Sequence, residues 1–139
     1  MHIHKTTIRV RYADTDQMKF AYHPKYLEYF EVGRTEMMRD LGLPYKVIEN
    51  NGYLMPLIAS HLEYEKSAFY DELLEIETRV ENLPVVKVHL DYIIRKVETK
   101  EIVVEGYTDL VFIKSKNNKI TRAPKFFIDK FRPIFDKKD

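Results

Sequence analysis

The chain has no cysteine and no tryptophan among its 139 residues. Without cysteine, disulfide bonds, catalytic thiols and cysteine-ligated zinc sites are excluded. No run approaches the roughly 18 apolar residues that a membrane-spanning helix needs, and the first residues lack the apolar core of a signal peptide. From these absences we expect a cytoplasmic protein without a membrane span.

Charge of neither sign dominates. The chain has 23 lysine and arginine residues and 22 aspartate and glutamate residues, for a net charge of +1. This balance gives no indication of a nucleic-acid partner. Hydrophobic residues make up 45% of the chain, and ten tyrosines and eight phenylalanines supply aromatic surface for a core or a pocket. The length suits one domain over residues 1–139.

Hydrophobic periodicity predicts one strand followed by one long helix. Lys5–Tyr12 alternates polar and apolar residues, which is typical of a strand with one solvated face. Pro24–Leu41 repeats apolar residues at helical spacing. Pro24 suits the first position of a helix, and Gly42 suits its end.

The second half of the chain changes to strand patterns. We expect a short helical turn at Tyr45–Asn51 and a terminal helix at Pro124–Phe135. Four strands are predicted between them, at Leu57–Tyr64, Leu73–Glu81, Val85–Val97 and Ile102–Ile113. One helix followed by consecutive strands predicts an α+β fold with an antiparallel sheet packed on the helix.

The segment between the first strand and the long helix carries two carboxylates, Asp14 and Asp16, close to the helix start at Pro24. Free N–H groups at a helix start can stabilise an oxyanion, and a nearby carboxylate can act as nucleophile or general base. The residues alone leave two other interpretations open. Aspartates of this kind often only satisfy a turn, and Asp14, Asp16 and His23 have the ligand types of a metal site.

Two motifs are distinctive. The first motif joins Asp14-Thr15-Asp16, Tyr22-His23, an aromatic helix start at Tyr26–Phe30 and Arg34-Thr35-Glu36. The second motif is Tyr64–Glu72, which precedes a predicted strand. Together they resemble the 4-hydroxybenzoyl-CoA thioesterase family, especially the branch that includes the Tol-Pal-associated acyl-CoA thioesterases. The resemblance extends over nearly the whole chain in the order of elements.

The resemblance implies a hotdog fold, in which an antiparallel sheet wraps around a long central helix. It implies a homodimer, or a dimer of dimers, with active sites at the subunit interface. It also implies hydrolysis of acyl-CoA thioesters without metal or cofactor. By position, Asp16 is the catalytic carboxylate, the His23 N–H polarises the thioester carbonyl, and the Tyr22 and His23 side chains assist.

Substrate-binding residues are expected around the same segment. The candidates are Met18, Lys19, Phe20, Tyr26 and Ser67. Lys19 stands where relatives usually carry glycine, which permits positive φ and close backbone approach to a ligand. Lys19 therefore indicates either a backbone that does not need glycine or a changed pocket entrance, where its ammonium group could reach a CoA phosphate.

Contacts to the CoA nucleotide are harder to place. The turn at residues 82–86 lacks the basic and serine residues that several relatives carry there, and Ser67 replaces a proline of the second motif. A basic cluster near the C-terminus could contact CoA phosphates or could be a solvated turn. Its members are Lys114, Lys116, Lys119, Arg122 and Lys125.

We therefore expect an acyl-CoA thioesterase. Two alternatives stay open from the sequence. One is a hotdog dehydratase or hydratase acting on acyl-CoA or acyl carrier protein, and the other is a non-catalytic acyl-CoA binder.

Overall fold

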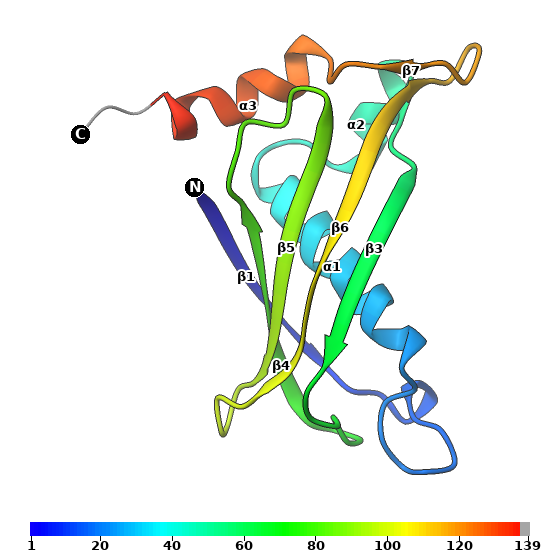
Figure 1. The fold of residues 1–139 in the computed structure, drawn as a ribbon, viewed down its shortest axis with the longest axis vertical. Coiled ribbons are helices and arrows are strands. Elements are labelled where there is room, and N and C mark those ends of the chain that lie inside the picture. Colours follow the sequence, from blue (N-terminus) through cyan, green and yellow to red (C-terminus); the bar gives the residue numbers. More distant parts are fainter. Residues whose placement is uncertain (137–139) are drawn as a thin grey trace.

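The computed structural model describes residues 1–136, in which an antiparallel sheet curves around one long helix, α1 (Pro24–Asp40) (Figure 1). The short helices are η1 (Tyr12–Asp14), α2 (Tyr45–Asn50) and α3 (Lys125–Phe135). The strands are β1 (His2–Arg9), β2 (Tyr53–Leu54), β3 (Leu57–Tyr64), β4 (Leu73–Val80), β5 (Lys87–Lys96), β6 (Ile102–Lys114) and β7 (Ile120–Thr121). This is the α+β architecture that the sequence pattern predicts and the hotdog arrangement that the resemblance implies.

The long strands lie in the order β1-β4-β5-β6-β3, all antiparallel. β3 forms one edge and pairs with β6, with Leu57 opposite Leu110 and Tyr64 opposite Val104. The short strands β2 and β7 pair with the far end of β6. The loop before α1 and the hairpin between β6 and β7 consequently lie at opposite ends of the molecule (Figure 1).

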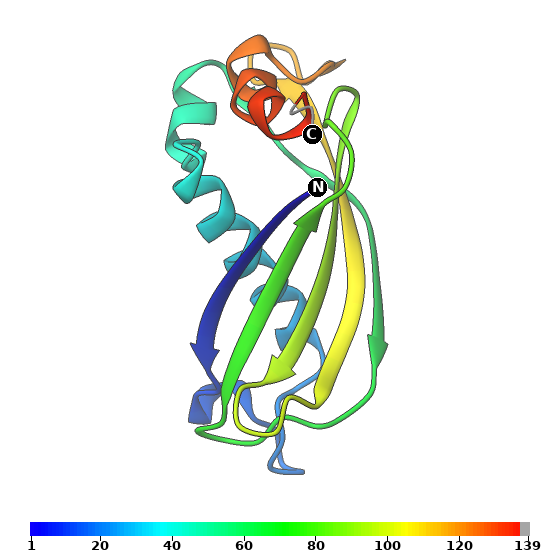
Figure 2. The same cartoon turned by 90° about the vertical axis from the view of Figure 1, so that its left-hand side faces the viewer.

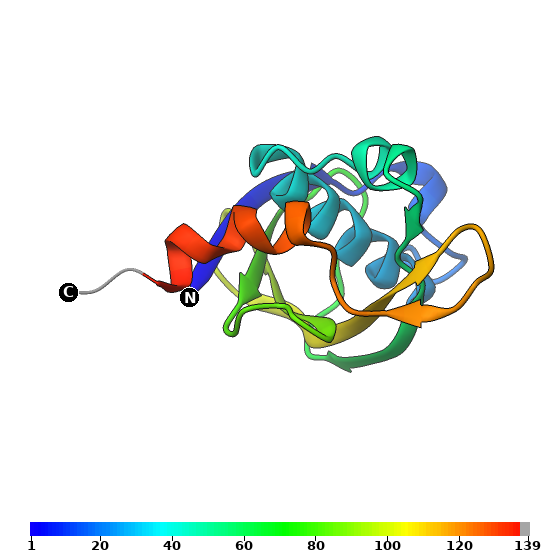
Figure 3. The same ribbon diagram turned by 90° about the horizontal axis from the view of Figure 1, so that it is seen from above.

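The sheet packs closely on one flank of α1 only. Figures 2 and 3 show α1 on the concave side of the sheet, where it contacts β1, β4 and β5. The Phe30 ring stacks on Tyr92 of β5 with 4.2 Å between ring centroids. Gly33 allows the close approach, because a Cβ there would lie 2.6 Å from Thr78 Oγ1 and 2.7 Å from Ile76 Cγ2 on β4.

The opposite flank of α1 faces β3 and is less covered. Seven of the eight residues of β3 are exposed, and only Leu62 is half-buried. Leu57, Ile58 and Tyr64 are large apolar residues among those exposed positions. A strand with an unpaired edge and two open faces is a template for association with another chain.

The first strand begins and ends three residues earlier than predicted. Tyr12 is 77% exposed and opens η1 instead of continuing the strand. The shift arises because polar residues occupy the inward positions of the first half of β1, so no apolar alternation marks it. His4, one of these, has its Nε2 2.8 Å from Asp40 Oδ2 at the end of α1.

The other predicted long elements match the structure within about two residues. The two-residue strands β2 and β7 and the turn η1 were not predicted, because so few residues show no periodicity. Within residues 1–136, none of the helices has the length and apolar character needed to cross a membrane.

Candidate active site

The loop between β1 and α1 forms a narrow hairpin. Thr15 lies opposite Ala21 in an antiparallel bridge, and the Tyr22 N–H donates to Asp14 O over 2.8 Å. The Ala21 N–H donates to Ala68 O over 2.7 Å, which attaches the hairpin to the segment before β4. The hairpin therefore holds Asp16 at a fixed position beside the approach to α1.

Asp14 anchors this hairpin from inside. Its side chain is 1% exposed, and its Oδ2 accepts hydrogen bonds from the Tyr29 hydroxyl at 2.9 Å and the Arg11 N–H at 3.1 Å. Its Oδ1 accepts from Arg11 Nη2 at 3.0 Å. Burial alone would raise the pKa of Asp14, but the hydrogen bonds from Arg11 and Tyr29 outweigh it and lower the pKa. Asp14 therefore has a structural role in this loop.

Asp16 has a different environment from Asp14. It is half-buried, and its Oδ1 accepts one hydrogen bond, from the Met18 N–H at 2.8 Å. Its Oδ2 has no hydrogen-bond partner within residues 1–136. Asp16 therefore has one carboxylate oxygen held by the loop and a second one free to act on a ligand.

Lys19 takes the left-handed backbone conformation that glycine favours, with φ of 72°. It ends the three-residue loop of residues 17–19, which the Lys19 N–H closes by donating to Asp16 O over 2.9 Å. Loops of this length commonly need a left-handed residue at their end. The position thus has the left-handed conformation that the expected glycine would adopt, and the lysine side chain is exposed at the loop tip.

Lys19→Gly should raise the melting temperature by a few degrees, because a side chain in the left-handed region costs about 1 kcal/mol. Lys100→Gly is the matched control, since Lys100 has φ of 68° in the hairpin between β5 and β6. Both variants should gain stability by thermal unfolding. An increased KM for an acyl-CoA in Lys19→Gly alone would support a substrate contact, and equal KM values in both variants would exclude it.

The start of α1 leaves one backbone donor free. Pro24 has no N–H, the Lys25 N–H donates to Tyr22 O at 2.8 Å, and the Tyr26 N–H donates to His23 O at 3.2 Å. The Tyr22 N–H donates to the backbone oxygen of Asp14. No acceptor within residues 1–136 bonds to the His23 N–H. At the positive end of a helix dipole, a free N–H can donate a hydrogen bond to an oxygen atom on which negative charge develops.

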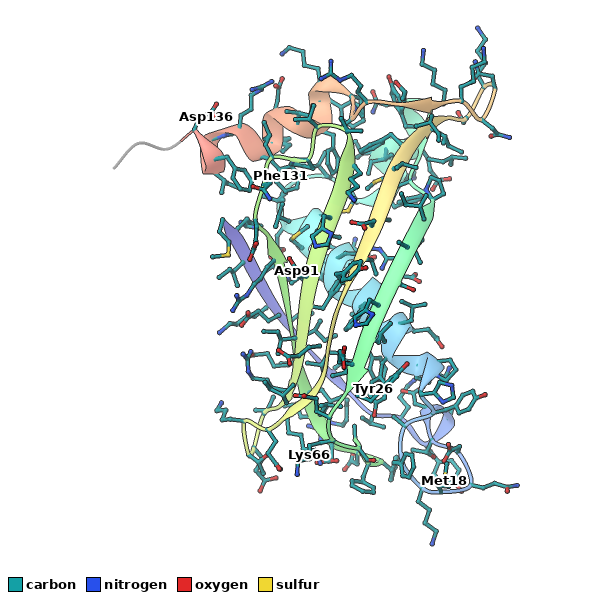
Figure 4. All side chains as sticks on the ribbon, in the orientation of Figure 1. Met18, Tyr26, Lys66, Asp91, Phe131 and Asp136 are labelled. Carbon is teal, nitrogen blue, oxygen red and sulfur yellow. The ribbon has the colours of Figure 1, made fainter. Side chains whose placement is uncertain are left out.

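A cavity of about 210 Å³ lies beside this helix start. Its walls include four of the predicted site residues, Phe20, His23, Tyr26 and Ser67. Met18, Lys19 and Tyr22 are exposed and do not line it, and Asp16 is also outside its lining within the single chain. Figure 4 shows Met18 at the loop end of the molecule and Tyr26 beside the end of β3.

Four of the lining residues were not singled out from the sequence as site residues: Ala21, Tyr64, Glu65 and Lys66. The last three belong to the second motif, so the sequence contained a signal that could have identified them. The Tyr64 ring lies 5.8 Å from Tyr26 and 6.2 Å from His23. The Tyr26 hydroxyl accepts a hydrogen bond from the Ala68 N–H at 3.3 Å, which couples α1 to the segment that carries Ser67.

A second cavity, of about 410 Å³, lies further along the open flank of α1. Its walls are Glu31, Arg34, Thr35, Met38, Tyr45, Met55 and Leu110. Arg34 Nη1 is buried there and has no hydrogen-bond partner within residues 1–136. A buried donor without an acceptor costs free energy, so an acceptor from a ligand or another chain would stabilise this flank.

The family model of the Thioesterase-like superfamily matches residues 10–131. The chain belongs to this superfamily. YneP of Bacillus subtilis, by name an acyl-CoA thioesterase, is 43% identical over 82 residues, which are 59% of this chain and 59% of that relative's length. An Aquifex aeolicus protein, by name an esterase, is 31% identical over 117 residues, covering 84% of this chain and 88% of that protein.

Among solved structures, a DHNA-CoA thioesterase from Staphylococcus aureus is similar with a TM-score of 0.90. It is 32% identical in sequence, and the match covers 98% of this chain and 93% of that one. These similarities confirm the thioesterase resemblance and the hotdog fold that the sequence predicted.

Proposed function

We propose that this protein hydrolyses acyl-CoA thioesters, with Asp16 as the catalytic carboxylate and the His23 N–H as the oxyanion donor. The observation that carries the proposal is the free His23 N–H beside a cavity, at the helix start that follows the Asp16 loop. Membership of the thioesterase superfamily and the names of the similar proteins support this reaction class.

The chemistry follows from these two groups. The His23 N–H polarises the thioester carbonyl, and the oxyanion that forms on attack is stabilised by this donor. Asp16 either attacks the carbonyl carbon itself, forming an anhydride that water hydrolyses, or removes a proton from the attacking water. In both routes the carbon–sulfur bond breaks, CoA leaves as the thiol, and water supplies the hydroxyl of the acid product. No metal or cofactor takes part in this proposal.

The surrounding side chains position the substrate. Phe20, Tyr26 and Ser67 form the walls next to the reacting carbonyl, while Met18 and Lys19 stand at the loop tip and the Tyr22 and His23 rings lie 4.9 Å apart at the entrance. The acyl group extends along the open flank of α1 towards Arg34. Arg34 lies eleven positions after His23, which corresponds to about 16 Å along a helix.

We further propose that the active unit is a homodimer formed through β3, and that dimers can pair further. In the part of the chain that the structure describes, Asp16 lies outside the cavity lining and Arg34 Nη1 lacks an acceptor, so a single chain leaves the site incomplete. The exposed edge and faces of β3 supply a surface for a second copy. A dyad-related β3 would cover the open flank of α1 in both copies.

Ile58→Lys should convert the dimer to a monomer, because it places a charge on the apolar edge strand that would be buried against the second copy. Ile58 is 56% exposed in the single chain. Ile3→Lys is the control, since Ile3 lies on β1 at the other edge of the sheet and is 44% exposed. Light scattering after size exclusion measures the mass. A dimer that survives Ile58→Lys would contradict the β3 interface.

Thiol release from a series of acyl-CoA substrates tests the reaction. Stoichiometric release of CoA thiol and free acid supports hydrolysis. Conversion without free thiol would indicate a hydratase or dehydratase, and binding without conversion would indicate an acyl-CoA binder. A cytoplasmic location remains a prediction from the sequence.

A further inference from the structure

Two charged residues on the open flank of α1 have no ion-pair partner within residues 1–136: Glu31, which is exposed, and Arg34, which is half-buried. An acid and a base three positions apart on a helix are close enough to pair. Glu36 and Arg39 have this spacing on the same helix and do pair, with 3.1 Å between Arg39 Nε and Glu36 Oε2. Glu31 and Arg34 do not, so both charges are available to another chain.

The surroundings of Glu31 and Arg34 make a partner necessary once this flank is covered. Both residues line the second cavity, and none of the other described residues in its walls is charged. A second copy placed over the flank would remove both side chains from water. Removing a charge from water is unfavourable unless an opposite charge lies beside it. A copy that covers this flank therefore has to bring an acid to Arg34 and a base to Glu31.

The two ends of β3 fix its level relative to α1. At one end, the Tyr64 ring lies 5.8 Å from the Tyr26 ring of α1. At the other end, Leu57 lies opposite Leu110, and Leu110 lines the second cavity together with Met38 of α1. The eight residues of β3 therefore extend along α1 from the level of Tyr26 to the level of Met38.

The dimer proposed through β3 brings the open flanks of two α1 helices together. A strand that pairs with its own copy about a dyad perpendicular to the sheet runs antiparallel to it, and the two α1 helices do the same. A dyad through the middle of β3 passes α1 at Val32, midway between Tyr26 and Met38. Glu31 precedes Val32 by one position and Arg34 follows it by two. Glu31 of each copy therefore faces Arg34 of the other.

We propose that Glu31 of one subunit and Arg34 of the other form two reciprocal ion pairs across the dimer axis, which we call the helix clamp. The clamp joins the two α1 helices between the two active sites. Glu31 lies eight positions after His23, about 12 Å along a helix. The clamp thus ends the acyl channel that begins at the oxyanion donor of each subunit. This inference rests on the proposed hydrolysis and on the β3 dimer.

Charge reversal in two separate proteins, E31R and R34E, tests the helix clamp. Each variant alone would form a homodimer with two like-charged contacts, so the Kd of the dimer should rise by about a hundredfold or more. A mixture of the two variants has opposite charges at both contacts, so it should form heterodimers. Light scattering after size exclusion measures the mass, and native mass spectrometry identifies the heterodimer.

Two controls accompany this test. E36R and R39E change the acid and base that pair within their own chain and do not line the second cavity, so each should remain a homodimer. If circular dichroism shows that R34E is unfolded, R34Q replaces it. A mixture of E31R and R34Q should again favour the heterodimer, because one contact keeps the native charges and the other loses its repulsion.

The mixture decides between pairing across the dimer and pairing within one chain. A pair within one chain would be restored only by E31R/R34E in the same protein, so a mixture of single variants that stays monomeric would overturn the clamp. Single variants that stay dimeric and only change KM would also overturn it. A monomeric wild type would contradict both the clamp and the β3 dimer.

Thiol release by the wild type is measured separately from association. Hydrolysis by the wild type together with a mixture that does not associate would retain the proposed reaction and remove only this inference. In the expected result, thiol release is low in each single variant at concentrations where it is monomeric. It returns in the mixture as the heterodimer forms, because the dimer is the proposed active unit.

Discussion

Asp16→Asn should lower kcat for acyl-CoA hydrolysis by about 10²–10⁴-fold, the effect typical of losing a general base or nucleophile. Asparagine has nearly the same shape, and its amide oxygen can still accept the Met18 N–H hydrogen bond that holds the loop. It can neither take a proton from water nor form an anhydride with the acyl group. The thiol-release assay measures kcat, and thermal unfolding checks that the variant is folded.

Asp14→Asn is the informative control, because Asp14 is the buried anchor of the same hairpin. It should lower the melting temperature, since the charged carboxylate accepts hydrogen bonds from Arg11 and Tyr29. The protein that remains folded should retain turnover. Near-wild-type kcat in Asp16→Asn, or a larger loss of kcat in folded Asp14→Asn, would contradict the assignment of Asp16.

Gly106→Ala should destabilise the protein by about 3 kcal/mol or more, which lowers the melting temperature by about 10 °C. Gly106 lies in the middle of β6, opposite Leu62 of β3. A Cβ at this position would lie 1.9 Å from the carbonyl oxygen of His61. Because that neighbour is backbone, a side chain must push β3 away from β6, so the variant should also lose the proposed dimer.

Gly52→Ala separates this steric effect from the effect of backbone conformation. Gly52 has φ of +86°, and the nearest atom to an added Cβ is Ser115 Oγ at 4.0 Å. Its substitution should cost about 1 kcal/mol through strain alone and should leave the dimer intact. If chemical denaturation gave the two glycine variants equal losses, the close contact between β3 and β6 would not be the cause.

The sequence predicted the long elements because their ends carry local signals. Pro24 and Gly42 bound the central helix, and Leu57–Tyr64 is the observed range of β3. The start of β1 was missed because His2, His4 and Thr6 occupy its inward positions, so burial there has no hydrophobic pattern. The two-residue strands β2 and β7 exist because they pair with β6. Such pairing depends on contacts between distant residues, which the periodicity of a short segment does not reveal.

The candidate site was predictable in part. The first motif indicated that the loop carries the site. Only the resemblance to the family identified Asp16, and not Asp14, as the expected catalytic carboxylate. The structure shows how the two aspartates differ. Asp14 accepts a hydrogen bond from the hydroxyl of Tyr29, fifteen residues further along the chain, whereas one carboxylate oxygen of Asp16 has no partner among the described residues. No local spacing reveals that contact. The exposure of β3 is likewise visible only once the order of strands is known.

The central helix presents two flanks with separate tasks. Phe30, Gly33 and Met37 are buried on the flank that packs against the sheet of the same chain. Glu31 and Thr35 line the second cavity on the other side, where the sheet of the same chain imposes few constraints. In the proposed site, where the acyl group extends along this flank, substitutions at Glu31 and Thr35 should change which acyl groups are accepted while the stability of each subunit is preserved. Related sequences built on this scaffold would diverge in specificity through one side of a single helix.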